Sequence, residues 1–155
     1  MISLIVAVDL NGCIGLNGKM PWHIKEELKH FKEYTWGKKV LIGRKTFAGL
    51  YKPLENRYHY ILTGSNFQID DGEIVTNLDD LIHQYKNSDE ELVVIGGAQV
   101  YKQLLNHVDK MVISVIQEEY EGDTYFPIFD ISQFETESIK KHERFIIYTL
   151  VRKEN

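Results

Sequence analysis

The sequence is poor in cysteine and has no cluster of basic residues. Cys13 is the only cysteine, so no disulfide can form within the chain, and the predicted location is the reducing cytoplasm. No run of Lys or Arg exceeds two residues, and the formal net charge is −5. Because duplex nucleic acids and anionic membranes select basic surfaces, neither is predicted as a partner.

Two further absences narrow the class of protein. No stretch approaches the roughly 20 apolar residues of a membrane span. The apolar start, Met1–Val8, lacks the basic residues of a signal peptide and meets Asp9 too early for one. The six histidines show neither His-x-x-x-His nor Cys/His spacing. The sequence therefore predicts a protein with no membrane segment and no metal site.

The pattern that the sequence does contain is an alternation of apolar runs with amphipathic stretches. The apolar runs have the length of strands, and several are continuously apolar, which is typical of strands buried on both faces. The alternation predicts an α/β fold in a single domain over residues 1–155, with a central, mostly parallel twisted sheet, an antiparallel C-terminal strand and about four flanking helices. The predicted strands are Ile2–Val8, Val40–Ile42, Tyr60–Leu62, Leu92–Ile95, Met111–Ile116 and Phe145–Val151, and the predicted helices are Ile24–Tyr34, Lys45–Leu50, Leu78–Tyr85 and Ala98–Leu105.

The predicted helix Ile24–Tyr34 carries one charge on its apolar side. At about 100° per residue its apolar residues share one arc, and Glu27 falls between Phe31 and Tyr34 on that arc. A glutamate at the edge of an apolar stripe commonly reaches back to water. Two aromatic neighbours and the preceding Trp22 instead favour a dehydrated carboxyl group with a raised pKa and a cationic or donor-rich partner. Glu27 is therefore predicted to bind or protonate a ligand.

Two strand-to-helix transitions are candidates for phosphate binding. In the first, the strand ending at Ile42 leads into Gly43, the cations Arg44 and Lys45, and the hydroxyl of Thr46. Free backbone N–H groups, the helix dipole and two cations favour an anion at such a helix start. The alternative is a basic pair on an ordinary surface turn, and glycine and threonine at these offsets favour the anion site.

The second transition follows the strand that ends at Ile95. Gly96 and Gly97 would let a ligand lie against bare backbone at the start of the next predicted helix. The spacing is not that of the Gly-x-Gly-x-x-Gly fingerprint, so a standard dinucleotide-binding site is not predicted. A simple tight turn is the alternative, and the pair of glycines gains significance only together with the first transition.

Several motifs together resemble those of one family. They occur in the order Asp9–Gly15 with Met20-Pro21-Trp22, Gly43–Phe47, Pro53-Leu54 with Arg57, Ile95-Gly96-Gly97 with Tyr101, and Gly122-Asp123-Thr124 with Phe126-Pro127. Each motif is weak alone, but their order and spacing are specific and span nearly the whole chain. The chain resembles dihydrofolate reductase of the chromosomal bacterial type.

The resemblance implies a monomer that reduces 7,8-dihydrofolate to 5,6,7,8-tetrahydrofolate with NADPH. It implies that hydride passes to C6 of the pterin and that Glu27 promotes protonation of N5, with Ser114 and Trp22 as further catalytic residues. Arg57 would bind the α-carboxylate of the glutamate tail. The substrate-binding residues that the resemblance implies are Ile5, Ala7, Leu28, Phe31, Leu50, Leu54 and Arg57.

The resemblance also implies a cofactor site and a loop that closes over it. Arg44 would lie near the 2′-phosphate of NADPH, and Asn17–Met20 would belong to a mobile loop braced by Gly122-Asp123. The cofactor-binding residues that it implies are Ala7, Ile14, Gly43, Arg44, Lys45, Thr46, Thr63, Ile95, Gly96, Gly97, Ala98, Gln99 and Tyr101.

The sequence departs from the family pattern at several positions. Glu27 stands where bacterial members commonly carry aspartate, and Glu55-Asn56 replaces the usual Pro-Gly before Arg57. Gly49 and Tyr51 are unusual residues for the rim of the substrate site. Gly64 stands where a serine often helps to hold the 2′-phosphate, so the preference for NADPH depends more strongly on the two cations of the first transition.

Two other functions fit part of this pattern. A reductase on the same fold that acts on a riboflavin-pathway pyrimidine would share Gly96-Gly97 but would not need Glu27 buried beside Trp22. A catalytically inert nucleotide-binding module would bind NADPH without oxidising it. An assay with dihydrofolate and the pyrimidine separates these alternatives.

Overall fold

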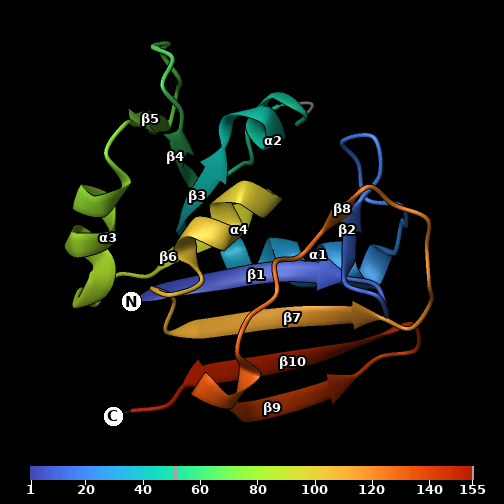
Figure 1. Ribbon diagram of the computed structural model, residues 1–155. Coiled ribbons are helices and arrows are strands. Elements are labelled where there is room, and N and C mark those ends of the chain that lie inside the picture. Colours follow the sequence, from blue (N-terminus) through green and yellow to red (C-terminus); the bar gives the residue numbers. More distant parts are fainter. Residues whose placement is uncertain (51, 155) are drawn as a thin grey trace.

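A continuous eight-stranded sheet forms the centre of the computed structural model, which describes residues 1–50 and 52–154 (Figure 1). The strands lie in the order β5-β4-β3-β6-β1-β7-β10-β9. Tyr51, one of the departures at the predicted rim, lies outside the described residues. The strands are β1 (Ile2–Val8), β3 (Lys39–Gly43), β4 (Tyr58–Leu62), β5 (Gly72–Val75), β6 (Leu92–Gly96), β7 (Lys110–Ile116), β9 (Phe134–Lys141) and β10 (Phe145–Arg152).

The sheet confirms the predicted fold class and adds two strands to it, β5 and β9. The strands from β5 to β7 pair in parallel, whereas β10 pairs antiparallel with both β7 and β9. The prediction contained β10 but neither β9 nor the short edge strand β5. In β9 only Phe134 is buried, and most of the strand is polar and exposed, as is common for a strand at the edge of a sheet. Apolar runs alone could not reveal it.

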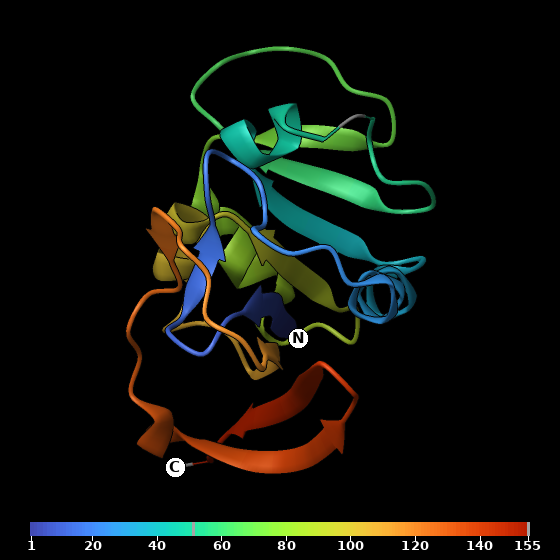
Figure 2. The ribbon, with the colours of Figure 1, turned by 90° about the vertical axis from the view of Figure 1, so that its right-hand side faces the viewer.

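Helices cover the two faces of the sheet unequally. Figures 1 and 2 show α1 (Lys25–Thr35) on one face and both α3 (Leu78–Lys86) and α4 (Ala98–Leu104) on the other. The short helix α2 (Arg44–Ala48) follows β3 directly at its carboxyl end, and a 3-10 turn, η1 (Ile131–Gln133), precedes β9. The four predicted helices are therefore present, with ends that differ by one or two residues. No helix in the described ranges is both long and apolar enough to cross a membrane.

Successive residues of the central strands fill two separate cores. In β1, Leu4 and Val6 belong to the core beneath α3 and α4, whereas Ile5 belongs to the core beneath α1. This follows from the alternation of side chains along a strand, and burial of both faces explains why the strand is continuously apolar. The core beneath α1 also contains Trp22 and Val112, which brings the start of α1 next to β7.

Two short strands join loops that are far apart in the sequence. β2 (Cys13–Gly15) pairs with β8 (Thr124–Tyr125), so the loop after β1 is held against the loop after β7. Both strands are too short for a periodic pattern, and the sequence did not predict them. Their position beside the carboxyl end of β1 in Figure 1 places both loops close to the start of α1.

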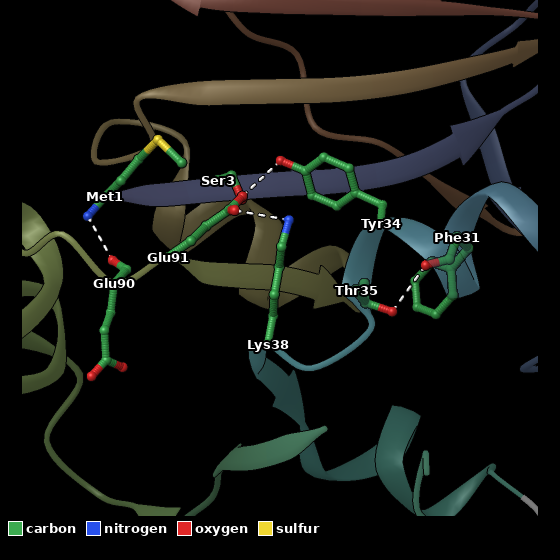
Figure 3. Close-up of polar contacts among 8 residues, drawn as sticks. All are labelled: Met1, Ser3, Phe31, Tyr34, Thr35, Lys38, Glu90 and Glu91. Carbon is green, nitrogen blue, oxygen red and sulfur yellow. Dashed lines mark hydrogen bonds and ion pairs between the residues drawn. The ribbon is translucent and has the colours of Figure 1, made fainter. Parts of the chain in front are cut away.

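At the amino ends of β1 and β6, a carboxylate has several partners (Figure 3). Glu91 accepts hydrogen bonds from Ser3 Oγ at 2.5 Å and Tyr34 Oη at 2.6 Å, and Lys38 Nζ lies 2.9 Å from its other oxygen. Burial raises the pKa of Glu91, but the three donors outweigh burial and hold the pKa below its usual value. Because Tyr34 lies in the last turn of α1, this cluster attaches the end of the helix to the sheet.

Candidate active site

The start of α1 presents Glu27 to the interior. The side chains of Glu26 and Glu27 both lie in the first helical turn, where the helix dipole favours negative charge, but only Glu27 is buried. Its exposed fraction is 4%, and Ile24 and Trp22 nearby are buried as well. The structure therefore places the Glu27 side chain on the apolar side of the helix, as the sequence predicted.

The Glu27 carboxyl group has no partner of the kind that the sequence predicted. Within residues 1–50 and 52–154 it forms no hydrogen bond or ion pair, so the cationic or donor-rich partner that the sequence predicts would have to come from a bound ligand. Burial raises the pKa of Glu27 to about 7. A carboxyl group in this setting exchanges its proton near neutral pH, which is the property required of a general acid.

Two further predicted catalytic residues each carry a buried polar atom that has no partner in the described ranges. Among the described residues, neither Trp22 Nε1 nor Ser114 Oγ forms a hydrogen bond. Ser114 lies on β7 directly opposite Ala7 of β1, and its side chain is fully buried. Buried polar groups in proteins nearly always have partners, so groups that lack them commonly bind water or a ligand. Two of the predicted catalytic residues thus have hydrogen-bonding capacity left over.

Tyr101 connects Glu27 to the opposite face of the sheet. Its hydroxyl donates a hydrogen bond to the Ile5 carbonyl oxygen at 2.8 Å and is buried. Burial raises the pKa of Tyr101, and the negative charge of Glu27 raises it further, so the two groups lie close enough to interact. Ile5, Ala7, Tyr101, Ser114 and Glu27, all predicted site residues, are therefore brought together.

Arg57 is buried, and part of its hydrogen-bonding capacity is used by the protein. Nε donates to Thr35 Oγ1 at 3.1 Å and Nη2 donates to the Lys32 carbonyl oxygen at 2.9 Å, while Nη1 donates to the Glu55 carbonyl oxygen. A guanidinium group has five N–H donors, so one on each Nη remains. Two parallel N–H donors match the two oxygens of a carboxylate.

The two strand-to-helix transitions meet at the carboxyl ends of β3 and β6. A Cβ atom added to Gly97 would lie 2.8 Å from Thr46 Oγ1, and one added to Gly43 would lie 3.7 Å from the Gly97 backbone nitrogen. The starts of α2 and α4 are therefore adjacent, and any residue larger than glycine would displace Thr46. Bare backbone at two neighbouring helix starts is a suitable place for phosphate groups.

A family model described as "Dihydrofolate reductase" matches residues 1–149 of the chain. The chain belongs to the dihydrofolate reductase family. Dihydrofolate reductases of Bacillus subtilis, Haemophilus influenzae and Staphylococcus aureus are 38%, 37% and 33% identical to it. These matches cover 86%, 87% and 88% of the chain, and 80%, 84% and 84% of the relatives.

A solved structure agrees with this assignment. Dihydrofolate reductase from Enterococcus faecalis, complexed with NADP(H) and RAB-propyl, superposes with a TM-score of 0.89 at 31% sequence identity. The match covers 99% of this chain and 97% of the other. The family resemblance seen in the sequence is therefore confirmed, and this dihydrofolate reductase is an NADP-dependent oxidoreductase.

The sequence did not identify one residue near the predicted cofactor site, Ser65. Arg44 Nη1 donates a hydrogen bond to Ser65 Oγ at 2.7 Å, and the Arg44 guanidinium lies 5.8 Å from the centre of the Phe67 ring. The Ser65 backbone nitrogen in turn donates to Thr63 Oγ1 at 3.0 Å. The family pattern pointed to a serine at position 64, where this chain has glycine, but Ser65, one residue later, carries the hydroxyl that Gly64 lacks.

Two aspartates of the reductase hold the loops beside Glu27. The buried carboxylate of Asp9 accepts hydrogen bonds from the backbone nitrogens of Asn11, Cys13 and Tyr120 at 2.8, 2.9 and 2.8 Å. The Tyr120 ring packs against Trp22 with centroids 5.4 Å apart. Asp9 therefore fixes a neighbour of a predicted catalytic residue.

The second aspartate lies in the segment that was predicted to brace a mobile loop. Asp123 Oδ2 accepts a hydrogen bond from the Asn17 backbone nitrogen at 3.0 Å, and the Asp123 backbone nitrogen donates to the Gly15 carbonyl oxygen at 2.9 Å. The structure thus contains contacts between Asn17 and Asp123 of the kind that a brace requires.

Most of the remaining predicted residues are only half-buried or exposed. Leu28 and Phe31 are half-buried on α1, one and four residues after Glu27. Four others are also half-buried, namely Leu50, Leu54, Ile14 and Ile95. At the two helix starts, Ala98 is half-buried, whereas Lys45 and Gln99 are exposed.

Proposed function

We propose that the chain reduces 7,8-dihydrofolate to 5,6,7,8-tetrahydrofolate, with hydride delivered to C6 and protonation of N5 promoted by Glu27. The observation that carries this proposal is a buried carboxyl group with a pKa of about 7 that has no partner within residues 1–50 and 52–154. Protonation of N5 places positive charge on the pterin, which makes C6 a better hydride acceptor. A carboxylate held in a dehydrated site stabilises that charge more strongly than water does.

Ser114 and Trp22 support the same proposal. The Ser114 hydroxyl offers a donor and acceptors, and Trp22 Nε1 offers a donor. A pterin carries exocyclic N–H and carbonyl groups at one edge, so these buried atoms would gain hydrogen bonds, directly or through water, when substrate binds. Substrate orientation would then depend on Glu27, Ser114 and Trp22 together.

Arg57 would determine the position of the other end of the substrate. Its two remaining N–H groups would bind the α-carboxylate of the glutamate tail in a bidentate manner. The backbone carbonyls of Glu55 and Lys32 hold the guanidinium in place. Binding both ends of dihydrofolate would orient C6 without any contact to C6 itself.

The cofactor would bind across α2 and α4, where the residues present fit its phosphate groups. NADPH, when bound, supplies the hydride. At the helix starts Gly97 leaves its backbone uncovered beside the Thr46 hydroxyl. Arg44 and Lys45 contribute positive charge. Arg44 and Ser65 would bind the 2′-phosphate and so favour NADPH over NADH.

A spectrophotometric assay tests the function directly. Oxidation of NADPH should require dihydrofolate and should not occur with a riboflavin-pathway pyrimidine. NADPH binding without oxidation would indicate an inert nucleotide-binding module, and turnover of the pyrimidine alone would indicate the other reductase. Either result would contradict the proposal.

A further inference from the structure

A fully buried histidine on β4 connects separate segments of the chain. His59 Nε2 accepts a hydrogen bond from the Leu54 backbone nitrogen at 3.1 Å, and Nδ1 lies 3.4 Å from the Asp71 carbonyl oxygen. An imidazole nitrogen that accepts a hydrogen bond carries no proton, so Nδ1 is the protonated nitrogen. The arrangement therefore requires the neutral ring with its proton on Nδ1.

The surroundings of His59 leave the ring little freedom. The Phe47 ring of α2 packs edge-on against it, with centroids 5.7 Å apart. The His59 backbone nitrogen donates to the Asp71 carbonyl oxygen at 2.9 Å. A Cβ atom added to Gly72 would lie 2.5 Å from the His59 carbonyl oxygen, so the start of β5 packs directly on β4. A movement of the ring would displace α2, β5 or the segment that contains Leu54.

This histidine lies beside the part of the site assigned to the substrate tail. Leu54 is a predicted substrate-binding residue, and Arg57 is the proposed ligand of the tail carboxylate. Arg57 precedes His59 by two residues and is close enough to influence its charge. Glu27 and the unpartnered atoms of Trp22 and Ser114 have no hydrogen bond to His59 in the described part of the chain.

We propose that His59 is a positioning residue for the p-aminobenzoylglutamate tail of dihydrofolate. Its neutral imidazole holds the backbone of Leu54 at the distance from Arg57 that tail binding needs. The inference rests on the proposed function, because it assumes that the tail lies between Leu54 and Arg57. It predicts that His59 affects binding of the tail and leaves hydride transfer to the pterin unchanged.

Protonation of His59 would disrupt this arrangement. A proton on Nε2 would face the Leu54 N–H group, so the hydrogen bond between them would be lost. The charged groups that face the ring are Arg57, from the same stretch of chain, and Asp71, from the segment before β5, whereas α2 contributes the uncharged Phe47. Burial lowers the pKa of His59, and Arg57 lowers it further against the opposing effect of Asp71. The Michaelis constant for dihydrofolate should therefore rise as the pH falls below the usual histidine value.

Two substitutions separate the roles of the two ring nitrogens. In His59→Gln the side-chain oxygen reaches the position of Nε2, which keeps an acceptor for Leu54 that does not titrate. In His59→Asn the shorter amide reaches only the position of Nδ1, which keeps the contact to Asp71 but removes the acceptor. We expect His59→Asn to raise the Michaelis constant for dihydrofolate about tenfold with kcat unchanged. His59→Gln should stay near the wild-type value and lose the rise at acid pH.

A substrate without a tail provides the readout that a general structural role would not give. With 6-methyl-7,8-dihydropterin, His59→Asn should have the Michaelis constant and kcat of the wild type. Equal losses with both substrates, or a fall in kcat, would overturn the proposal. Should His59→Asn fail to fold in a thermal unfolding assay, His59→Gln still decides the question, since a retained rise at acid pH contradicts it. His83→Gln, at an exposed histidine of α3, is the control for loss of a histidine.

The two proposals fail in different ways. A wild-type chain that reduces neither pterin would overturn the proposed function and this inference with it. A wild-type chain that reduces both, together with a His59→Asn variant that is impaired equally on both, would overturn only the role of His59.

Discussion

Two glutamates near opposite ends of α1 differ in how their charge is stabilised. Glu91, beside the last turn of the helix, is held by Ser3, Tyr34 and Lys38, and its pKa lies below the usual value. Glu27, in the first turn, has no partner among the described residues, and its pKa is raised to about 7. Both side chains are largely shielded from water. Partners, and not burial alone, therefore decide which carboxylate belongs to the structure and which is available for chemistry.

Two buried serines show the same difference. Ser3 and Ser114 are both 0% exposed, on the neighbouring strands β1 and β7. Ser3 donates to Glu91, whereas Ser114 Oγ has no partner in the described ranges. Ser3, near the amino end of β1, is thus satisfied by the fold itself, whereas the Ser114 hydroxyl has hydrogen-bonding capacity left over.

The largest expected effect is on catalysis. Glu27→Gln should reduce the rate of dihydrofolate reduction at pH 7 by about 100- to 1,000-fold, because the proton source beside N5 is lost. The rate should recover partly in acid as the substrate takes its proton from solvent. Steady-state kinetics from pH 5 to about 9 would measure this. Glu26→Gln, at the exposed neighbour, is the matched control, and wild-type rates in Glu27→Gln at every pH would contradict the role of Glu27.

Glu27→Gln, which should slow the reaction, should also make the folded chain more stable. The Glu27 pKa is about 7 in the folded chain against 4.5 in the unfolded one, so ionisation destabilises the fold increasingly as the pH rises from 4.5 through 7. Above pH 7 Glu27→Gln should therefore increase the free energy of unfolding by up to about 3 kcal/mol. Near pH 4.5 the difference should vanish. Urea unfolding at both pH values would show this, and equal stability at alkaline pH would contradict the raised pKa.

Ionisation of Glu91 should stabilise the fold, in contrast to ionisation of Glu27. Its lowered pKa adds stability that is present above the usual carboxyl pKa and is lost as the pH falls through the folded value. Glu91→Gln should reduce the free energy of unfolding at pH 7 by about 2 kcal/mol, since charge-assisted bonds become neutral ones. It should leave kcat unchanged. A loss of activity at unchanged stability would remove the distinction between the two glutamates.

The smallest expected effect concerns the two serines. Ser3→Ala removes a donor from a buried carboxylate and should reduce stability by about 1 kcal/mol. Ser114→Ala removes a hydroxyl that has no partner among the described residues, and should change stability by less than about 0.5 kcal/mol. Differential scanning calorimetry of both variants measures the contrast. Equal destabilisation would show that Ser114 is also part of the structural network.

Much of this arrangement could be predicted from local sequence patterns. The helical periodicity of α1 was enough to place Glu27 on the buried side, because burial of a helix residue depends mainly on its angular position. The parallel order of the central strands followed from their alternation with helices. Glycines after β3 and β6 indicated helix starts with exposed backbone, and the structure brings those starts together.

Contacts between distant segments could not be predicted in this way. Nothing near Arg57 in the sequence indicates that Thr35 and the Lys32 carbonyl oxygen would hold its guanidinium. That Glu27 has no partner in the part of the chain that the structure describes is likewise a property of the whole fold. A periodic pattern can show that a carboxyl group is dehydrated, but it cannot show whether its partner comes from the protein or from a bound ligand.

The Asp9 carboxylate has a consequence for how the sequence of this chain can vary. Every group that it binds is a main-chain amide, so the side chains of Asn11, Cys13 and Tyr120 play no part in those bonds. Substitution of the exposed Asn11, apart from proline, would leave these bonds intact, whereas Cys13 is fully buried against Gly122 and Tyr120 packs on Trp22. Natural variants can therefore differ at this exposed position while the loops keep their relative position, and replacement of Asp9 itself would leave the β2–β8 pairing and the Asp123 contacts to hold the two loops together.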